Sequence, residues 1–146
     1  MNICLYGSGS RKIDEIYTDA AYELGCRMAE NGHTLVFGGG DTGMMGACAR
    51  GVHDNDGNSI GIAPEWIGNF EPLCERCSEF IYVDTMDERK QNFLDKSDAF
   101  IISPGDDCEW GRSLVVARGL LIVRRLLLQS VGSRHTDFSS CGTRAQ

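Results

Sequence analysis

Short apolar runs alternate along this chain with longer stretches in which apolar residues recur at helical spacing. The runs are bounded by Gly, Pro, Ser and Asn residues and predict strands at 2–6, 34–37, 58–63, 79–83 and 98–103. The periodic stretches predict helices at 14–31, 44–54 and 86–96. Strands that alternate with helices form right-handed βαβ crossovers. The predicted fold class is therefore α/β, a three-layer Rossmann-like sandwich with a mostly parallel sheet.

The stretches outside these elements indicate how the chain divides into a domain and a tail. Residues 65–78 have no clear period and predict a loop, whereas 114–128 is mostly apolar and compatible with a helix. We expect one α/β domain over 1–128 and an irregular tail over 129–146. The sequence contains no run of eighteen or more apolar residues, so no membrane-spanning helix is predicted. The N-terminal residues lack a basic segment and are not typical of a signal peptide.

The net charge and the spacing of the cysteines argue against nucleic-acid binding and against a zinc ribbon. A net charge of −7 argues against binding along a nucleic acid, which requires a concentration of Lys and Arg. The seven cysteines are odd in number and scattered, which favours free thiols and a cytoplasmic location. Cys74 and Cys77 form a C-x-x-C, but the second pair of a zinc ribbon is missing. The pair also follows a loop rather than a βα junction, and we interpret its spacing as coincidental.

Glycine-rich segments follow three of the predicted strands, at 7–10, 38–46 and 103–105. In a parallel sheet these segments meet at the carboxyl edge, where ligands bind. The segment 7–10, with Ser8, is compatible both with binding of a phosphate or ribose and with a plain tight turn.

The segment 38–46 is more specific. Its glycines let the backbone approach a ligand and let the following helix pack closely on the sheet, so that the first amides of the helix form an anion site. It matches neither the dinucleotide fingerprint nor the Walker A loop. A purely structural glycine cluster is the alternative. The residues that would contact a ligand are Gly38, Gly39, Gly40, Gly43, Met44, Met45 and Gly46.

Charged residues open the helix predicted at 86–96. Acidic residues in its first turn suit the helix dipole, and Arg89 and Lys90 follow directly. A guanidinium binds a phosphate or carboxylate with two parallel hydrogen bonds, so Arg89 is a candidate ligand-binding residue. The alternative is a solvated charged face.

In this order and spacing, the motifs resemble the LONELY GUY family of cytokinin riboside 5′-monophosphate phosphoribohydrolases. The family pattern has G-S-S, G-G-G-x-x-G-L-M-G, G-V-I-P, M-x-x-R-K and D-A-F-I-A-L-P-G-G-x-G-T-x-x-E. The corresponding segments here are Gly7–Gly9, Gly38–Gly46, Gly61–Pro64, Met86–Lys90 and Asp98–Gly105.

The resemblance implies hydrolysis of the N-glycosidic bond of a nucleoside 5′-monophosphate, such as AMP or a cytokinin ribotide. Free base and ribose 5-phosphate would be the products. It assigns a catalytic role to Arg89, adds Lys90, Pro104 and Gly105 to the substrate site, and implies a homodimer. It implies no metal and no cofactor.

The last motif of the family is broken in this chain. Where the family continues G-x-G-T-x-x-E, residues 106–112 read Asp-Asp-Cys-Glu-Trp-Gly-Arg. Arg112 stands at the position of the family's catalytic glutamate, and Glu109 lies three positions before it. We therefore expect hydrolysis to be impaired.

The charge balance changes at the same place. Residues 1–104 carry 8 basic and 17 acidic side chains, whereas residues 105–146 carry 6 and 4. A frameshift or truncation near codon 105 would produce this change, and natural divergence is the alternative. Two other functions remain open: a nucleotide-binding module without turnover, and a protein similar to molybdenum-cofactor carriers.

Overall fold

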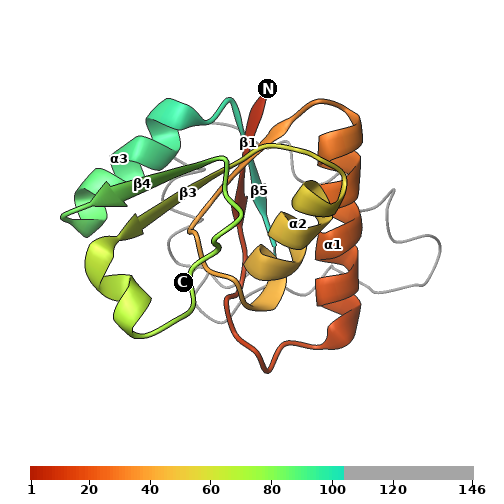
Figure 1. Cartoon of the computed structure of the whole chain (residues 1–146), viewed down its shortest axis with the longest axis horizontal. Helices are drawn as coiled ribbons and strands as arrows, with labels where there is room; N and C mark the ends of the chain where they lie inside the picture. Colours follow the sequence, from red (N-terminus) through yellow and green to blue (C-terminus); the bar gives the residue numbers. More distant parts are fainter. Residues whose placement is uncertain (104–146) are drawn as a thin grey trace, which may run out of the picture.

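The computed structural model describes residues 1–103, in which strands and helices alternate (Figure 1). The elements are β1 (Asn2–Tyr6), α1 (Glu15–Glu30), β2 (Thr34–Phe37), α2 (Gly43–Asp54), β3 (Ser59–Pro64), the 3₁₀ helix η1 (Glu65–Asn69), β4 (Glu79–Val83), α3 (Met86–Lys96) and β5 (Ala99–Ile102). The apolar segment 114–128, which is compatible with a helix, and the irregular tail expected at 129–146 lie outside the described residues.

The strands form one parallel sheet in the order β4-β3-β2-β1-β5. The inner strand β1 pairs with β2 on one side, as Ile3 with Leu35, and with β5 on the other, as Cys4 with Phe100. Strands β2, β3 and β4 are added in turn on one side of β1, whereas β5 is added on the other side. The strand order therefore reverses between β1 and β5. Crevices for ligands open at such a switch point, outside the carboxyl ends of the strands. The predicted parallel sheet is confirmed.

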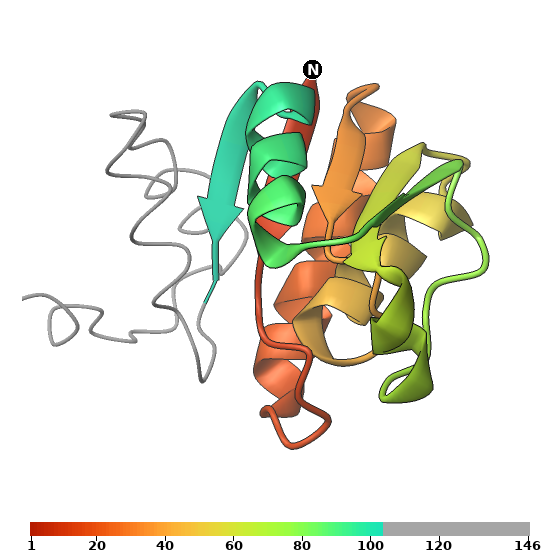
Figure 2. The ribbon, with the colours of Figure 1, turned by 90° about the vertical axis from the view of Figure 1, so that its left-hand side faces the viewer.

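Helices cover both faces of the sheet. Ile3 and Leu5 point to the face that carries α1 and α2, and their neighbour Cys4 points to the face that carries α3. Figure 2 shows α3 in front of the strands and the other two helices behind them. Because both faces are buried, the strands read as continuous apolar runs rather than as alternating ones. The three-layer sandwich predicted from those runs is confirmed.

Helices α1 and α2 approach each other at two glycines. A Cβ on Gly25 would collide with the Cys48 carbonyl oxygen, and a Cβ on Gly51 would collide with the Tyr22 carbonyl oxygen. Each helix thus presents a glycine to the backbone of the other. Only glycine permits such a close contact between the helices, because every other residue carries a Cβ atom.

The start of α3 is set by side chains of its first turn. The Thr85 Oγ1 atom accepts a hydrogen bond from the Glu88 amide at 3.1 Å, and the Glu88 carboxylate accepts one from the Asp84 amide at 3.0 Å. This reciprocal capping fixes where the helix begins. It places the first turn of α3, with Arg89, at the carboxyl edge of the sheet.

The segment between β3 and β4 differs from the predicted loop. It begins with η1, and Leu73 then forms an isolated antiparallel bridge with Gly40. The turn and the bridge depend on contacts with other segments, which a local pattern does not contain. Within residues 1–103, no helix has both the length and the apolar character needed to cross a membrane.

Candidate functional site

The loops after β1 and β2 are bonded to each other at the carboxyl edge of the sheet. The Met44 amide donates to the Ser8 carbonyl oxygen at 2.8 Å, and the Thr42 hydroxyl donates to the Gly9 carbonyl oxygen at 2.7 Å. The two glycine-rich segments found in the sequence therefore form one continuous surface. The first turn of α2 starts from this surface.

Arg89 reaches this surface from α3. Its Nε atom donates to the Ile62 carbonyl oxygen at 2.9 Å, and its Nη2 atom donates to the Gly38 carbonyl oxygen at 3.1 Å. The guanidinium carbon also lies 5.5 Å from the centre of the Phe93 ring. The side chain thus spans the carboxyl ends of β3 and β2. The structure brings together Arg89 and the glycine loop, which the sequence analysis assigned to the same site.

Electrostatics keep this arginine charged. Burial lowers the pKa of Arg89, and the nearby Glu71 carboxylate opposes that shift. An arginine side chain remains protonated even so. The guanidinium is therefore a permanent, partly desolvated cation, which suits the recognition of a phosphate.

Gly38 leaves the space that the guanidinium occupies. A Cβ on Gly38 would lie 2.6 Å from Arg89 Nη2 and 3.3 Å from Met45 Sδ. The neighbouring atoms are the ends of flexible side chains, not backbone. The glycine therefore sets where these two side chains can sit.

Glu71 is a site residue that the sequence analysis missed. Its carboxylate oxygens lie 3.8 Å from a Cβ built on Gly9 and 3.6 Å from one built on Gly40. We call the group formed by this carboxylate and its neighbours the glycine crevice. Its members are Gly9, Gly38, Gly40, Met45, Glu71 and Arg89. The signal in the sequence was an acidic residue in the segment that follows β3 at the carboxyl edge.

Other predicted site residues serve the structure of the loops. The Ser8 hydroxyl accepts a hydrogen bond from the Ser10 amide at 3.1 Å, within its own turn. The Met44 side chain is buried in the core between sheet and helices. Gly39 has a φ of 78° and lies under the Phe80 ring, and Gly46 packs against the Asp41 backbone.

Lys90 makes a contact on its own helix, and two further predicted residues lie outside the part of the chain that the structure describes. The Lys90 ammonium lies 3.0 Å from a carboxylate oxygen of Asp87 on its own helix. Pro104 and Gly105 lie outside the described residues, directly after Ser103. The Ser103 hydroxyl donates to the Tyr6 carbonyl oxygen at 2.9 Å, at the switch point between β1 and β5.

The crevice can bind an anion and stabilise a cation beside it. Helix α2 has no acidic residue in its first turn, and the Thr42 hydroxyl makes no cap bond to it. The positive end of the helix lies at the glycine loop, where the Gly38 carbonyl oxygen accepts a hydrogen bond from Arg89, and the two together favour a phosphate. Glu71 provides a negative group nearby. No group of three or more His, Cys, Asp or Glu side chains within residues 1–103 is placed to hold a metal ion.

Comparison with known proteins gives one family and several relatives. The SLOG cluster4 family matches residues 1–111. The cytokinin riboside 5′-monophosphate phosphoribohydrolase LOG of Oryza sativa subsp. japonica is 39% identical over 103 residues, which are 70% of this chain and 43% of the rice protein. The enzyme of the same name from Mycobacterium tuberculosis is 41% identical over 87 residues, 60% of this chain and 46% of that protein. The chain thus spans less than half the length of these relatives.

Solved structures share the architecture. The molybdenum cofactor carrier protein of Chlamydomonas reinhardtii superposes with a TM-score of 0.68 at 22% identity, covering 81% of this chain and 71% of that one. At this identity the likeness shows the fold alone. The family match ends at residue 111, inside the segment where the sequence departs from the phosphoribohydrolase pattern.

Proposed function

The chain belongs to the SLOG cluster4 family, and on that premise we propose that it binds a nucleoside 5′-monophosphate in the glycine crevice. Its curated relatives bear the name of cytokinin riboside 5′-monophosphate phosphoribohydrolases, in agreement with the motifs found in the sequence. AMP or a cytokinin ribotide is the proposed ligand. The proposed reaction is hydrolysis of the bond between base and ribose.

The observation that carries the proposal is the position of Arg89. Its guanidinium is fixed by two backbone carbonyls, of Ile62 and Gly38, at the start of the glycine loop. A cation held in this way needs no reorganisation to receive a phosphate. The first turn of α2 adds the positive end of a helix dipole to the same place.

The reaction itself needs a negative group near the ribose. As the base departs with the bonding electrons, positive charge develops on the sugar ring, and a carboxylate stabilises it and orients the attacking water. In the family pattern this carboxylate is the glutamate of the last motif, whose position here is Arg112. Glu71 places a carboxylate in the crevice beside Arg89, and we propose that it supplies the residual stabilisation.

We propose that turnover in this chain is weak. Residues 106–112 lack the glycines and the glutamate of the family motif, and Arg112 adds positive charge where the family has negative charge. A nucleotide-binding protein without turnover is the second candidate, because the crevice residues among 1–103 do not depend on the broken motif.

One experiment separates these outcomes. Calorimetry measures AMP binding, and chromatography of the same mixture measures released adenine, with the variant Glu71→Gln run in parallel. We expect binding with slow or no release, and a further loss of any release in the variant. Absence of binding would overturn the proposal. Rapid release of adenine that is unchanged in Glu71→Gln would show that another residue supplies the catalytic carboxylate. Glu109 would then be the first residue to test.

We further propose that the protein forms a homodimer. Two aromatic side chains of the η1 segment are exposed, Trp66 by 50% and Phe70 by 82%, and their ring centres lie 6.2 Å apart. Large exposed apolar groups that lie together favour an interface. Light scattering checks this directly, with twice the chain mass of 16.0 kDa as the expected result and the mass of a single chain as the contrary one.

A further inference from the structure

A pair of thiols lies immediately behind the glycine loop. Cys74 and Cys77 are free cysteines at the two ends of a turn that contains Glu75 and Arg76. The ends of such a turn lie within about 7 Å of each other. A disulfide requires Cα atoms about 4.4–6.8 Å apart, so the backbone already has a compatible span.

The two sulfurs interact with each other and have room to do so. A hydrogen bond with the Cys77 side chain lowers the pKa of Cys74 to about 7, and the same bond raises the pKa of Cys77. The Cys77 sulfur occupies space left open by Gly61, 3.3 Å from the position that a Cβ there would take. One thiol of the pair therefore ionises readily while its neighbour keeps its proton.

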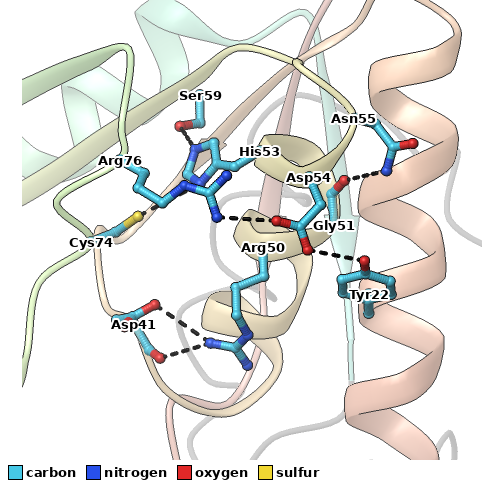
Figure 3. A network of polar contacts seen from close by, with 10 residues as sticks. All are labelled: Tyr22, Asp41, Arg50, Gly51, His53, Asp54, Asn55, Ser59, Cys74 and Arg76. Atoms are coloured by element: carbon cyan, nitrogen blue, oxygen red, sulfur yellow. Dashed lines mark hydrogen bonds and ion pairs between the residues drawn. The ribbon is translucent and has the colours of Figure 1, made fainter.

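A histidine adjoins this pair. The His53 Nδ1 atom lies 4.0 Å from the Cys74 sulfur, and its Nε2 atom lies 2.7 Å from the Ser59 hydroxyl oxygen (Figure 3). Burial lowers the pKa of His53, so the ring is neutral at pH 7. The Cys74 sulfur thus has an uncharged hydrogen-bonding group at its side.

The segment that carries Cys74 is bonded to the glycine loop. The Cys74 amide donates to the Gly39 carbonyl oxygen at 2.8 Å, and the Asp41 amide donates to the Pro72 carbonyl oxygen at 2.9 Å. Gly40 and Leu73 form the antiparallel bridge between these two bonds. A change in the backbone at Cys74 is therefore transmitted to the loop through direct hydrogen bonds.

We propose that Cys74 and Cys77 are a redox-active dithiol that a hydroperoxide oxidises to an intramolecular disulfide, which alters the backbone contacts between 72–74 and 39–41. The inference needs no nucleotide and stands apart from the proposed function. Cys74, Cys77 and the glycine loop are all among the described residues.

The steps balance as follows. The Cys74 thiolate attacks one oxygen of hydrogen peroxide and the O–O bond breaks, which gives a sulfenic acid and hydroxide. The hydroxide takes up the proton that the thiol had released. The Cys77 sulfur then attacks the Cys74 sulfur, the S–O bond breaks, and hydroxide leaves with the Cys77 proton as water. Two thiols lose two electrons and two protons, and one peroxide becomes two waters.

Other cysteines in the described part of the chain provide a contrast. Burial raises the pKa of Cys4 and of Cys48 to about 12, so these thiols stay protonated and inert. Cys26 is partly exposed, on helix α1 away from the pair. The variant Cys26→Ser is therefore a matched control that removes an accessible thiol without touching the dithiol.

Trypsin provides a direct test because it cleaves after Arg76, between the two cysteines. Residues 51–76 then contain only Cys74, and residues 77–89 contain only Cys77. After treatment of the intact chain with hydrogen peroxide and capping of free thiols, we expect the two peptides to remain joined, and a reductant to separate them. The joined pair should form in Cys26→Ser and be lost in Cys74→Ser and Cys77→Ser. Peptides that stay separate at a peroxide dose that oxidises Cys26 would overturn the proposal.

A second measurement tests the consequence for the loop. Hydrogen exchange at the Asp41 and Cys74 amides should change on the order of five- to tenfold on oxidation, the scale of one backbone hydrogen bond. The change should reverse with reductant and be absent in Cys77→Ser, in which a hydroxyl replaces the thiol. Unchanged exchange at both amides in the oxidised protein would show that the disulfide forms without reaching the loop, and would overturn that part of the proposal.

Discussion

Glycines serve two different purposes in this molecule, one between helices α1 and α2 and one in the glycine crevice. At Gly25 and Gly51, an added Cβ would meet the backbone of the opposite helix. At Gly38, an added Cβ would meet the ends of the Arg89 and Met45 side chains. In the first region glycine is needed for the fold. In the second it leaves space in which chemically active side chains are positioned.

The difference teaches how to separate stability from function in a glycine-rich chain. Backbone cannot move aside without disturbing a helix, whereas a long side chain can adopt another rotamer at modest cost. Substitution of a helix glycine should therefore reduce stability. Substitution of a crevice glycine should leave the fold intact and affect the ligand.

The largest expected effect comes from rebuilding the third glycine-rich segment. The combined changes Asp106→Gly, Cys108→Gly, Glu109→Thr and Arg112→Glu restore the family motif. Removal of one preorganised stabilising group typically costs 10²–10³ in rate, so we expect release of adenine from AMP to rise by about that factor or more. Chromatography of adenine measures it. The same four changes combined with Arg89→Ala should stay inactive, and a folded, AMP-binding quadruple variant without gain would contradict the assignment of the motif.

The second prediction compares the two regions directly. Gly25→Ala gains about 1 kcal/mol of helix propensity but forces α1 and α2 apart, so we expect a net loss of about 2–3 kcal/mol in the free energy of unfolding. Gly38→Ala should cost less than about 1 kcal/mol in stability while weakening AMP binding. Urea unfolding and calorimetry measure the two quantities. Equal losses of stability in both variants would remove the distinction.

The third prediction concerns the cation of the crevice. Arg89→Ala should weaken AMP binding by about 1.5–3 kcal/mol, the usual range for a charge-assisted hydrogen bond. Arg50→Ala is the control, because Arg50 is exposed on α2 and, within residues 1–103, forms an ion pair with Asp41 at 3.4 Å. Titration calorimetry compares the variants with the parent chain. An Arg89→Ala protein with parental affinity would show that this side chain has only a structural role.

The smallest expected effect lies on helix α2, which begins at the glycine loop and carries His53 in its last turn. Burial lowers the pKa of His53 below 6.5, so the unfolded chain binds a proton more readily than the folded one. Stability is therefore complete above pH 6.5 and falls as the pH drops below it, by at most about 1.4 kcal/mol per pH unit. His53→Gln should flatten this part of the profile, as measured by urea unfolding between pH 7 and 5. If the free energy of unfolding fell equally steeply with pH in the variant and in the parent chain, the lowered pKa of His53 would be contradicted.

The fold could be predicted from sequence because each element is encoded locally. Buried parallel strands are continuous apolar runs, and the strand predicted at 58–63 differs from β3 by one residue at each end. Helix α3 was located by its charged first turn, which Thr85 and Glu88 cap. The parallel direction of the strands followed from the rules for βαβ crossovers rather than from any single residue.

The site was less predictable because its members meet only in three dimensions. Arg89 was predicted from its motif, but its carbonyl partners in β3 and the β2 loop belong to other segments. Glu71 was missed because residues 65–78 have no local period, and their path depends on backbone bonds to the glycine loop. The dithiol proposed for Cys74 and Cys77 departs from the interpretation of their spacing as coincidental, because it also depends on contacts between distant segments. The turn that brings the thiols together precedes β4 and is not at a βα junction.

The position of β1 between β2 and β5 has a consequence for how the chain folds while it is being made. One edge of β1 can pair with β2 as soon as β2 has been synthesised. The other edge pairs with β5, around Phe100, and stays unpaired until that strand has been synthesised. About 65 residues separate the ends of these two strands, which at typical rates of synthesis corresponds to roughly 3–13 s. For that interval an apolar strand edge remains open to pairing with other chains. Newly made protein should therefore depend on chaperones more than the finished fold would indicate.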